Sequence, residues 1–308
     1  SDATKGWVPL EDDVTALEPV APPTQKAIFG FGNTGSNVSI TNLVNSSGVV
    51  ATDTTGVGTA REKLGAAGYG GDKAIFGYGS AGPDLSMTNL VSNSGVVSTD
   101  VTGVGTARRD IRATTYGLDK AIFGYGVTSG VVSITNLVNS SGVVSTDVTG
   151  VGTAREQLGA AGYGGDKAIF GYGTNGGNVS MTNLVSSSGV VSADVSGVGT
   201  GRYALAAASY GSDKALFGYG YASSYVSITN LVSNTGVVSS DVSGVGTARF
   251  RLAAASYGGD KALFGYGNTG SQVSITNLVS SSGVVASNVT GVGTARSNLA
   301  AAGFSTSA

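Results

Sequence analysis

Six arginines occupy the same place in a repeating sequence and are the first residues whose type and spacing could do chemistry. They recur every 47 residues and comprise Arg61, Arg108, Arg155, Arg202, Arg249 and Arg296. If the repeat closes into a ring, all six guanidinium groups gather near one mouth of its channel, where they could bind an anion. The alternative is structural: each arginine pairs with a nearby acid or donates hydrogen bonds to loop carbonyl groups.

Aspartates accompany these arginines and favour the structural alternative. An aspartate stands eight residues before each of the first five arginines, at Asp53, Asp100, Asp147, Asp194 and Asp241, and Asn288 takes the sixth place. Five acids are therefore available to six arginines. The five N–H donors of each arginine also suit it to tying loops together.

Aromatic residues gather in loops that differ between the repeats. These loops follow the Phe-Gly-Tyr-Gly segment and the arginines, and strand direction places both sets on one side, here called the variable face. The residues that stand out come from consecutive repeats and are Tyr203, Tyr221, Tyr225, Phe250 and Arg251. Such side chains can stack on and hydrogen-bond a sugar, or form a protein hot spot. The competing explanation is chance, because single exposed aromatic residues are normal on protein surfaces.

Residues that commonly carry catalysis are missing from the chain. It contains no cysteine and no histidine, which excludes thiolate chemistry, a Ser-His-Asp triad and histidine metal sites. Asp84 and Asp110 are the only unusual acids on the variable face, and nothing in the sequence pairs them as a glycosidase requires. We therefore expect no catalytic residue, no metal ligand and no cofactor. A net charge of −2 with 12% charged residues also argues against a nucleic-acid partner.

The elements that position these residues follow from the 47-residue repeat. Each repeat has four strand-like pieces, such as the Ala-Ile-Phe-Gly-Tyr-Gly segment with its period of two, and none has helical spacing. Four short strands in a repeat of this length are typical of a propeller blade. We expect an all-β domain over residues 26–308, a six-bladed β-propeller of four-stranded blades. The glycines of Phe-Gly-Tyr-Gly would leave room for an aromatic side chain of the neighbouring blade.

The two ends of the repeat region complement each other. The first repeat begins at Lys26 without an alanine-rich strand, whereas the chain ends with an unpaired one that runs from Arg296 to Phe304. If the C-terminal strand joins the N-terminal blade as its inner strand, the ring closes and no sheet edge stays open. A linear solenoid would need distinct capping repeats, and the sequence contains none.

Residues 1–25 stand outside the repeat and form an acidic, proline-rich arm. Its prolines make it unsuitable for a helix or a central strand, and it contains the only tryptophan, Trp7. The arm either lies on the domain or is a disordered lead, or it anchors the protein to a partner with Trp7 as the buried group. No run of about 18 apolar residues predicts membrane insertion.

The order of pieces in each unit resembles the kelch repeat. An arginine leads through an alanine-rich strand and a Gly-Gly-Asp turn into Ala-Ile-Phe-Gly-Tyr-Gly, and Ser-Ile-Thr-Asn-Leu-Val follows. The resemblance covers residues 26–304 and implies a propeller. The chain departs from kelch in detail. Gly-Tyr-Gly at residues 77–79 replaces the double glycine, Thr-Asn at residues 88–89 replaces Tyr-Asp, and the kelch tryptophan is absent.

Several short segments of the repeat resemble tandem repeats of structural proteins in marine tailed phages. They are Phe-Gly-Tyr-Gly, Thr-Asn-Leu-Val-Ser, Gly-Val-Val and Gly-Val-Gly-Thr-Ala-Arg. That resemblance implies a virion or extracellular-surface location, with other virion or surface proteins as partners. The expected function is non-enzymatic: a tail, fibre or capsid-decorating component that docks to a larger assembly. The alternative is a carbohydrate-binding adhesin or lectin that contacts host polysaccharide through the variable face. A glycosidase is the third hypothesis.

Overall fold

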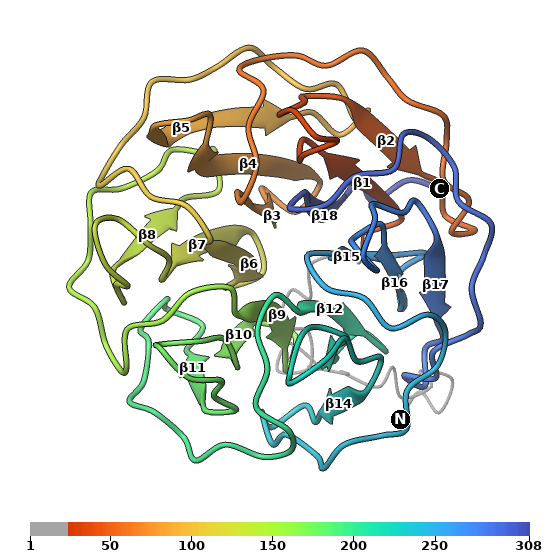
Figure 1. Ribbon diagram of the computed structural model, residues 1–308. Coiled ribbons are helices and arrows are strands. Elements are labelled where there is room, and N and C mark those ends of the chain that lie inside the picture. Colours follow the sequence, from red (N-terminus) through yellow and green to blue (C-terminus); the bar gives the residue numbers. More distant parts are fainter. Residues whose placement is uncertain (1–23) are drawn as a thin grey trace, which may run out of the picture.

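The structure, a computed structural model, describes residues 24–308, which fold into β-strands and connecting loops without an α-helix. Eighteen strands form six antiparallel sheets of three strands each. Figure 1 shows the sheets arranged around a common centre, with one strand of each sheet nearest to it. The described chain is therefore an all-β repeat protein of propeller-like form.

Each sheet has an inner, a middle and an outer strand. The inner strands are β3 (Gly65–Tyr69), β6 (Arg112–Tyr116), β9 (Gly159–Tyr163), β12 (Ala206–Tyr210), β15 (Ala253–Tyr257) and β18 (Ala300–Phe304). In the same order of sheets, the middle strands are β4 (Lys73–Ser80), β7 (Lys120–Gly124), β10 (Lys167–Gly171), β13 (Lys214–Gly218), β16 (Lys261–Gly265) and β1 (Lys26–Gly30). The outer strands are β5 (Asp84–Val91), β8 (Thr135–Val138), β11 (Thr182–Val185), β14 (Thr229–Val232), β17 (Thr276–Val279) and β2 (Thr41–Val44).

The middle strands are buried on both faces because neighbouring sheets cover them. In β4, the side chains of Ala74, Ile75 and Phe76 have no solvent exposure. Phe76 reaches the sheet of β1, where a Cβ added to Gly30 would lie 2.6 Å from the phenylalanine ring. The absence of a side chain at Gly30 therefore makes room for the neighbouring phenylalanine, as the sequence predicts.

The outermost segment of each repeat pairs with its sheet only at isolated positions. After β2, for example, Val50 makes a single bridge to Val44. The side chain of Asn42 donates a hydrogen bond to the carbonyl of Ala51 at 3.0 Å, so side-chain bonding replaces part of a regular strand ladder. The structure thus has three strands in each sheet where the sequence predicts four.

The first and last strands of the described chain belong to one sheet. β18 pairs with β1 in antiparallel fashion, from Lys26 opposite Phe304 to Gly30 opposite Ala300. β18 also contacts β15 on one side and β3 on the other. The C-terminal strand therefore occupies the inner position of the sheet that β1 and β2 begin.

Two sets of backbone hydrogen bonds run from sheet to sheet around the centre. In the first set, six residues each donate an N–H to the carbonyl of their counterpart in another repeat, at 2.8–3.2 Å: Lys63, Asp110, Gln157, Ala204, Arg251 and Asn298. Lys63 donates to Asn298, so this set joins the first complete repeat to the last. The second set links the hairpin turns at the other end of the inner strands, and there Ser305 donates to Asp72 at 2.7 Å.

The N-terminal arm predicted over residues 1–25 is described only at its end. Trp7 and the rest of residues 1–23 lie outside the described residues. Gln25 takes part in the hydrogen bonding between hairpin turns: its N–H donates to Ser305 (2.8 Å) and its carbonyl accepts from Gly258 (3.0 Å). The chain is therefore already fixed to the sheets at Gln25, one residue before β1.

Candidate functional site

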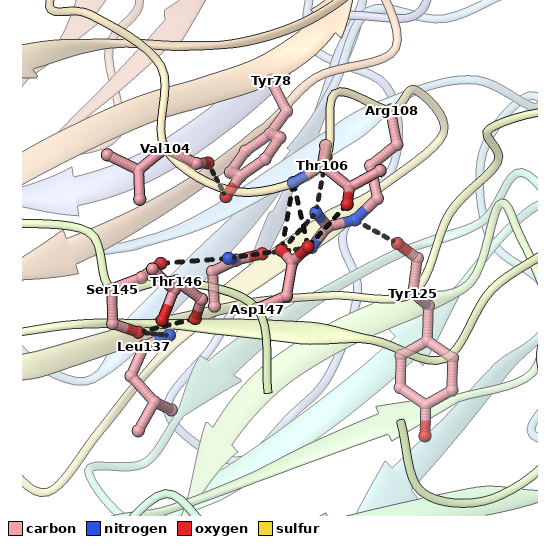
Figure 2. Close-up of polar contacts among 10 residues, drawn as sticks. Tyr78, Val104, Thr106, Arg108, Tyr125, Leu137, Ser145, Thr146 and Asp147 are labelled. Carbon is pink, nitrogen blue, oxygen red and sulfur yellow. Dashed lines mark hydrogen bonds and ion pairs between the residues drawn. The ribbon is translucent and has the colours of Figure 1, made fainter. Parts of the chain in front are cut away.

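Each repeat arginine lies where two sheets meet and forms the centre of a polar cluster, shown for Arg108 in Figure 2. Its Nε donates to the carbonyl of Tyr125 at 2.9 Å. One Nη donates to the carbonyl of Thr106 at 3.0 Å, and the other donates to Oδ1 of Asn136 at 2.7 Å. The guanidinium carbon lies 4.6 Å from the centre of the Tyr78 ring. Hydrogen bonds and an aromatic face of the protein itself therefore engage the guanidinium group.

An aspartate completes the cluster and comes from the following repeat. Asp147 accepts hydrogen bonds from the side chain of Asn136 (2.9 Å) and from the N–H and hydroxyl of Thr106. Its Oδ1 lies 3.9 Å from Arg108. Burial alone would raise the pKa of Asp147, but the hydrogen bonds outweigh burial and hold the pKa below its ordinary value. The acid beside Arg108 is thus Asp147, not the aspartate eight residues before the arginine.

Similar contacts surround all six repeat arginines, and each arginine is completely buried. Five of the clusters contain an aspartate, whereas Asn288 takes its place beside Arg249 and accepts from the N–H of Thr247 at 3.1 Å. Burial lowers the pKa of all six guanidinium groups. Two clusters are incomplete, because one Nη each of Arg249 and Arg296 and the Oδ1 atoms of Asn277 and Asn42 lack hydrogen-bond partners. The six arginines hold neighbouring sheets together, and none of them presents its guanidinium group to solvent.

The five residues singled out on the variable face lie together in one cluster, here called the aromatic cluster. The ring of Tyr221 lies 5.4 Å from Tyr203, 5.7 Å from Tyr225 and 6.0 Å from Phe250, measured between ring centres. Tyr225 and Phe250 stack at 4.9 Å with 17° between their planes. The guanidinium carbon of Arg251 lies 4.8 Å from the centre of the Phe250 ring. All five side chains are half-buried, so the cluster keeps an accessible surface.

Backbone bridges between loops hold the aromatic cluster in place. Tyr221 is bridged to Tyr203 and to Tyr225 beside the sheet of β12, β13 and β14, and Phe250 is bridged to Asn268 beside the next sheet. The same bridge joins Asn33 to Asn37 in the first repeat. The two repeats therefore share the same backbone bridge, and the aromatic cluster differs from the equivalent loops of the first repeat in its side chains.

One loop position reaches toward the neighbouring repeat in five of the six repeats, at residues 37, 84, 178, 225 and 272, and this contact was not predicted from the sequence. Tyr225 occupies that position in the aromatic cluster, where it stacks on Phe250. In other repeats the corresponding contacts are Asn37 to the carbonyl of Ser80, Asp84 to Arg109, Asn178 to the carbonyl of Ala222, and Gln272 to Asn33. The shared place in the repeat is the only sequence signal for it. Part of the variation on this face therefore serves contacts inside the molecule.

Arg251 differs from the repeat arginines in having its guanidinium group open. Among residues 24–308, its side chain makes no hydrogen bond and no ion pair, and its one close partner is the Phe250 ring. A cation on an aromatic face keeps its N–H donors at the ring edge for another ligand. The aromatic cluster thus offers rings and one unpaired positive charge side by side.

The two unusual acids of the variable face do not form a free carboxylate pair. Both oxygens of Asp84 accept hydrogen bonds from Arg109 at 3.0 Å. Asp110 is buried and has Lys63 at 3.9 Å and Nε of Arg109 at 4.0 Å. Burial raises the pKa of Asp110 to about 6. Arg109 therefore contacts both carboxylates, and neither is free of a positive partner.

Comparison with protein-family models and with curated proteins gives no match for this chain. Within residues 24–308, no helix is long and apolar enough to cross a membrane. The same residues contain no group of three or more acidic, histidine or cysteine side chains that could hold a metal ion.

Proposed function

We propose that this protein is a non-enzymatic structural and interaction protein that docks to a larger assembly through the aromatic cluster. The observation that carries the proposal is the cluster itself, which is contiguous across consecutive repeats and occurs once in the described chain. Tyrosine, phenylalanine and arginine in a half-buried patch are the residue types that dominate protein hot spots. A single asymmetric patch on a repetitive scaffold favours one protein partner over a repeated ligand.

The assembly that we propose is a virion or another extracellular surface structure. This part of the proposal depends on the resemblance of the repeats to structural proteins of tailed phages. The sheets are hydrogen-bonded to one another and carry one aromatic cluster. This arrangement suits a tail, fibre or capsid-decorating component, because such a component must hold its contact surface rigid.

A carbohydrate-binding adhesin is the second candidate function. The unpaired Arg251 beside aromatic rings favours it, because such rings can stack on a sugar while the guanidinium hydrogen-bonds its hydroxyl or carboxylate groups. The stacking of Tyr225 on Phe250 argues against the adhesin function, because each ring covers the face of the other that a sugar would stack on. A lectin built from repeats would also be expected to repeat its sugar-binding residues.

The two functions can be separated with a double variant that copies another repeat. Tyr221→Asn with Tyr225→Asn installs the residues that stand at the same places in the first repeat, Asn33 and Asn37, where the same backbone bridge forms. The variant should therefore fold while losing the aromatic surface. We expect immobilised wild-type protein to retain a defined protein from the purified parent assembly, and the variant to lose it. Saturable binding to bacterial or algal polysaccharides that the variant loses would replace docking with the adhesin function.

We propose further that the sheets are blades of a closed six-bladed propeller. The pairing of β18 with β1 and the hydrogen bond from Lys63 to Asn298 support closure. The isolated bridges outside each outer strand, such as Val44 to Val50, support a short fourth strand in each blade. A closed ring would give the aromatic cluster a fixed frame.

A further inference from the structure

A cavity of about 120 Å³ lies at the centre of the molecule, between the inner strands of all six sheets. Its lining is almost entirely alanine, glycine, serine, threonine and leucine. Arg112, the first residue of β6, is the one charged side chain that lines it. A single guanidinium group therefore faces an otherwise neutral, small-residue chamber.

Arg112 is not required by the fold. The equivalent position carries glycine or alanine in the other repeats: Gly65, Gly159, Ala206, Ala253 and Ala300. Two further positions of β6 also carry hydroxyl groups, since Thr114 stands where the other five repeats have alanine and Thr115 follows it. Both threonines line the same cavity. One wall of the cavity is therefore polar. The other five repeats form the same inner strand without an arginine or threonine at the positions of Arg112 and Thr114.

The hydrogen-bonding capacity of Arg112 and Thr114 is mostly unused, whereas the hydroxyl of Thr115 donates to the carbonyl of Gly68 at 2.9 Å. Of the five N–H donors of Arg112, one makes a hydrogen bond, from Nη1 to the carbonyl of Ile111 at 2.9 Å. No carboxylate of residues 24–308 lies within the 4.0 Å ion-pair distance of Arg112, and Asp110 has Lys63 and Arg109 at that distance. The hydroxyl of Thr114 makes one long contact, 3.5 Å to the carbonyl of Thr115.

A largely buried guanidinium group without an ion-pair partner is costly to the folded state, and the longer-range attraction of Asp110 offsets only part of that cost. Burial lowers the pKa of Arg112, as expected for a cation withdrawn from water. It nevertheless keeps some accessible surface, because its open side faces the cavity. An anion in the cavity would place a negative charge within ion-pair distance of Arg112 and accept hydrogen bonds from its free N–H groups, in an environment where charged hydrogen bonds are strong.

We propose that the central cavity binds one small oxyanion, a carboxylate or a phosphate, on the guanidinium group of Arg112. The planar fork of an arginine suits two oxygens of one anion, and the hydroxyl of Thr114 is placed on the same wall to donate a further bond. Cavities of about 150 Å³ hold a benzene molecule. This cavity therefore has room for formate, acetate or phosphate.

The test measures unfolding temperature against anion concentration, with sodium chloride added to keep ionic strength constant. One series of measurements uses formate and acetate and the other uses phosphate, so that a carboxylate ligand is distinguished from a phosphate ligand. A ligand present at a hundred times its Kd should raise the unfolding temperature of a chain this long by roughly 5 °C. We expect a saturable rise of this kind in the wild-type protein in at least one series.

Variants then tie the response to the cavity. Arg112→Ala copies the residue of three other repeats and should fold, and Arg112→Gln keeps the size of the side chain without its charge. Both should lose the response, Thr114→Ala should weaken it, and Lys120→Ala should keep it while making the same change in net charge. Phosphorus-31 line broadening of phosphate, measured on the same set, reports binding independently of stability. An equal response in Arg112→Ala, no response in the wild-type protein, or a response to chloride alone would overturn the proposal.

Discussion

At the scale of single residues, Asp110 is the acid whose ionisation works against the fold. Burial raises its pKa to about 6, and attraction from Lys63 and Arg112 offsets only part of that effect. The folded state therefore binds the proton more tightly than the unfolded state, whose pKa is about 3.9. Ionised Asp110 costs stability above pH 6, and this cost disappears below about pH 4. Two units of pKa correspond to at most ~3 kcal/mol.

We expect Asp110→Asn to raise the free energy of unfolding at pH 7 by about 1–3 kcal/mol, because the neutral amide avoids that cost. Asparagine tolerates the left-handed backbone at this position, where φ is 52°, and Asn298 has the same conformation at the equivalent place. Urea unfolding of both proteins from pH 4 to 7.5 checks the prediction. The gain should shrink toward zero near pH 4, and a gain independent of pH would show that Asp110 is not its source.

The repeat arginines give a second prediction at this scale, because their clusters are not equally complete. Replacing Arg108 with methionine leaves the carbonyls of Thr106 and Tyr125 and the amide of Asn136 without their donor. We expect a loss of about 3–5 kcal/mol in unfolding free energy. Arg249→Met should cost about 1 kcal/mol less, since Arg249 lacks the bond to Asn277. Denaturant unfolding of the two variants compares them directly, and equal losses would contradict the ranking.

At the scale of elements, the close approach of neighbouring sheets depends on glycine in the middle strands. A Cβ at Gly77 would lie 2.7 Å from the ring of Phe123 in the next sheet. Gly77→Ala should therefore destabilise the protein by about 1–3 kcal/mol. Gly177→Ala is the matched control, because nothing lies within 4 Å of a Cβ there and the residue is exposed. That control should stay within about 0.5 kcal/mol of wild type, and similar unfolding midpoints for both variants would refute the packing argument.

The elements also show how far the sequence alone could lead. Its strict period and alternating pattern predicted the sheets and the spacing role of Gly30. It did not predict that the fourth segment would pair only at isolated bridges, because the bond from Asn42 to Ala51 depends on the loop's three-dimensional path. It could not assign Asp147 to Arg108 either, since that contact crosses repeats and a uniform period makes every aspartate an equal choice. The aromatic cluster could be proposed because its members stand out from their repeat positions.

At the scale of the whole molecule, the C-terminal strand β18 pairs with β1 and so links the two ends of the described chain in one sheet. Deleting residues 296–308 removes β18, exposes the edge of β1, and breaks the backbone bonds made by Asn298 and Ser305. We expect gross loss of stability, seen as loss of the cooperative thermal transition. Deleting residues 306–308 alone should leave that transition in place. A 296–308 deletion that melts like the parent would show that the sheets do not depend on the join.

A rearranged chain tests whether the join matters through strand pairing or through the position of the termini. In the other repeats a short turn links the inner to the middle strand, as Gly70, Gly71 and Asp72 link β3 to β4. Ser305, one added glycine and Gln25 would reproduce that turn. A chain that runs from Gly291 to Ser305, through this glycine, and then from Gln25 to Thr290 places β18 directly before β1 and has its new ends beside the exposed residues 286–290. We expect it to melt cooperatively near the parent temperature, because every sheet contact is kept and circular permutation at exposed turns is tolerated. Failure to fold, beside a stable 306–308 deletion, would show that pairing of β18 with β1 is not sufficient when the chain ends are moved.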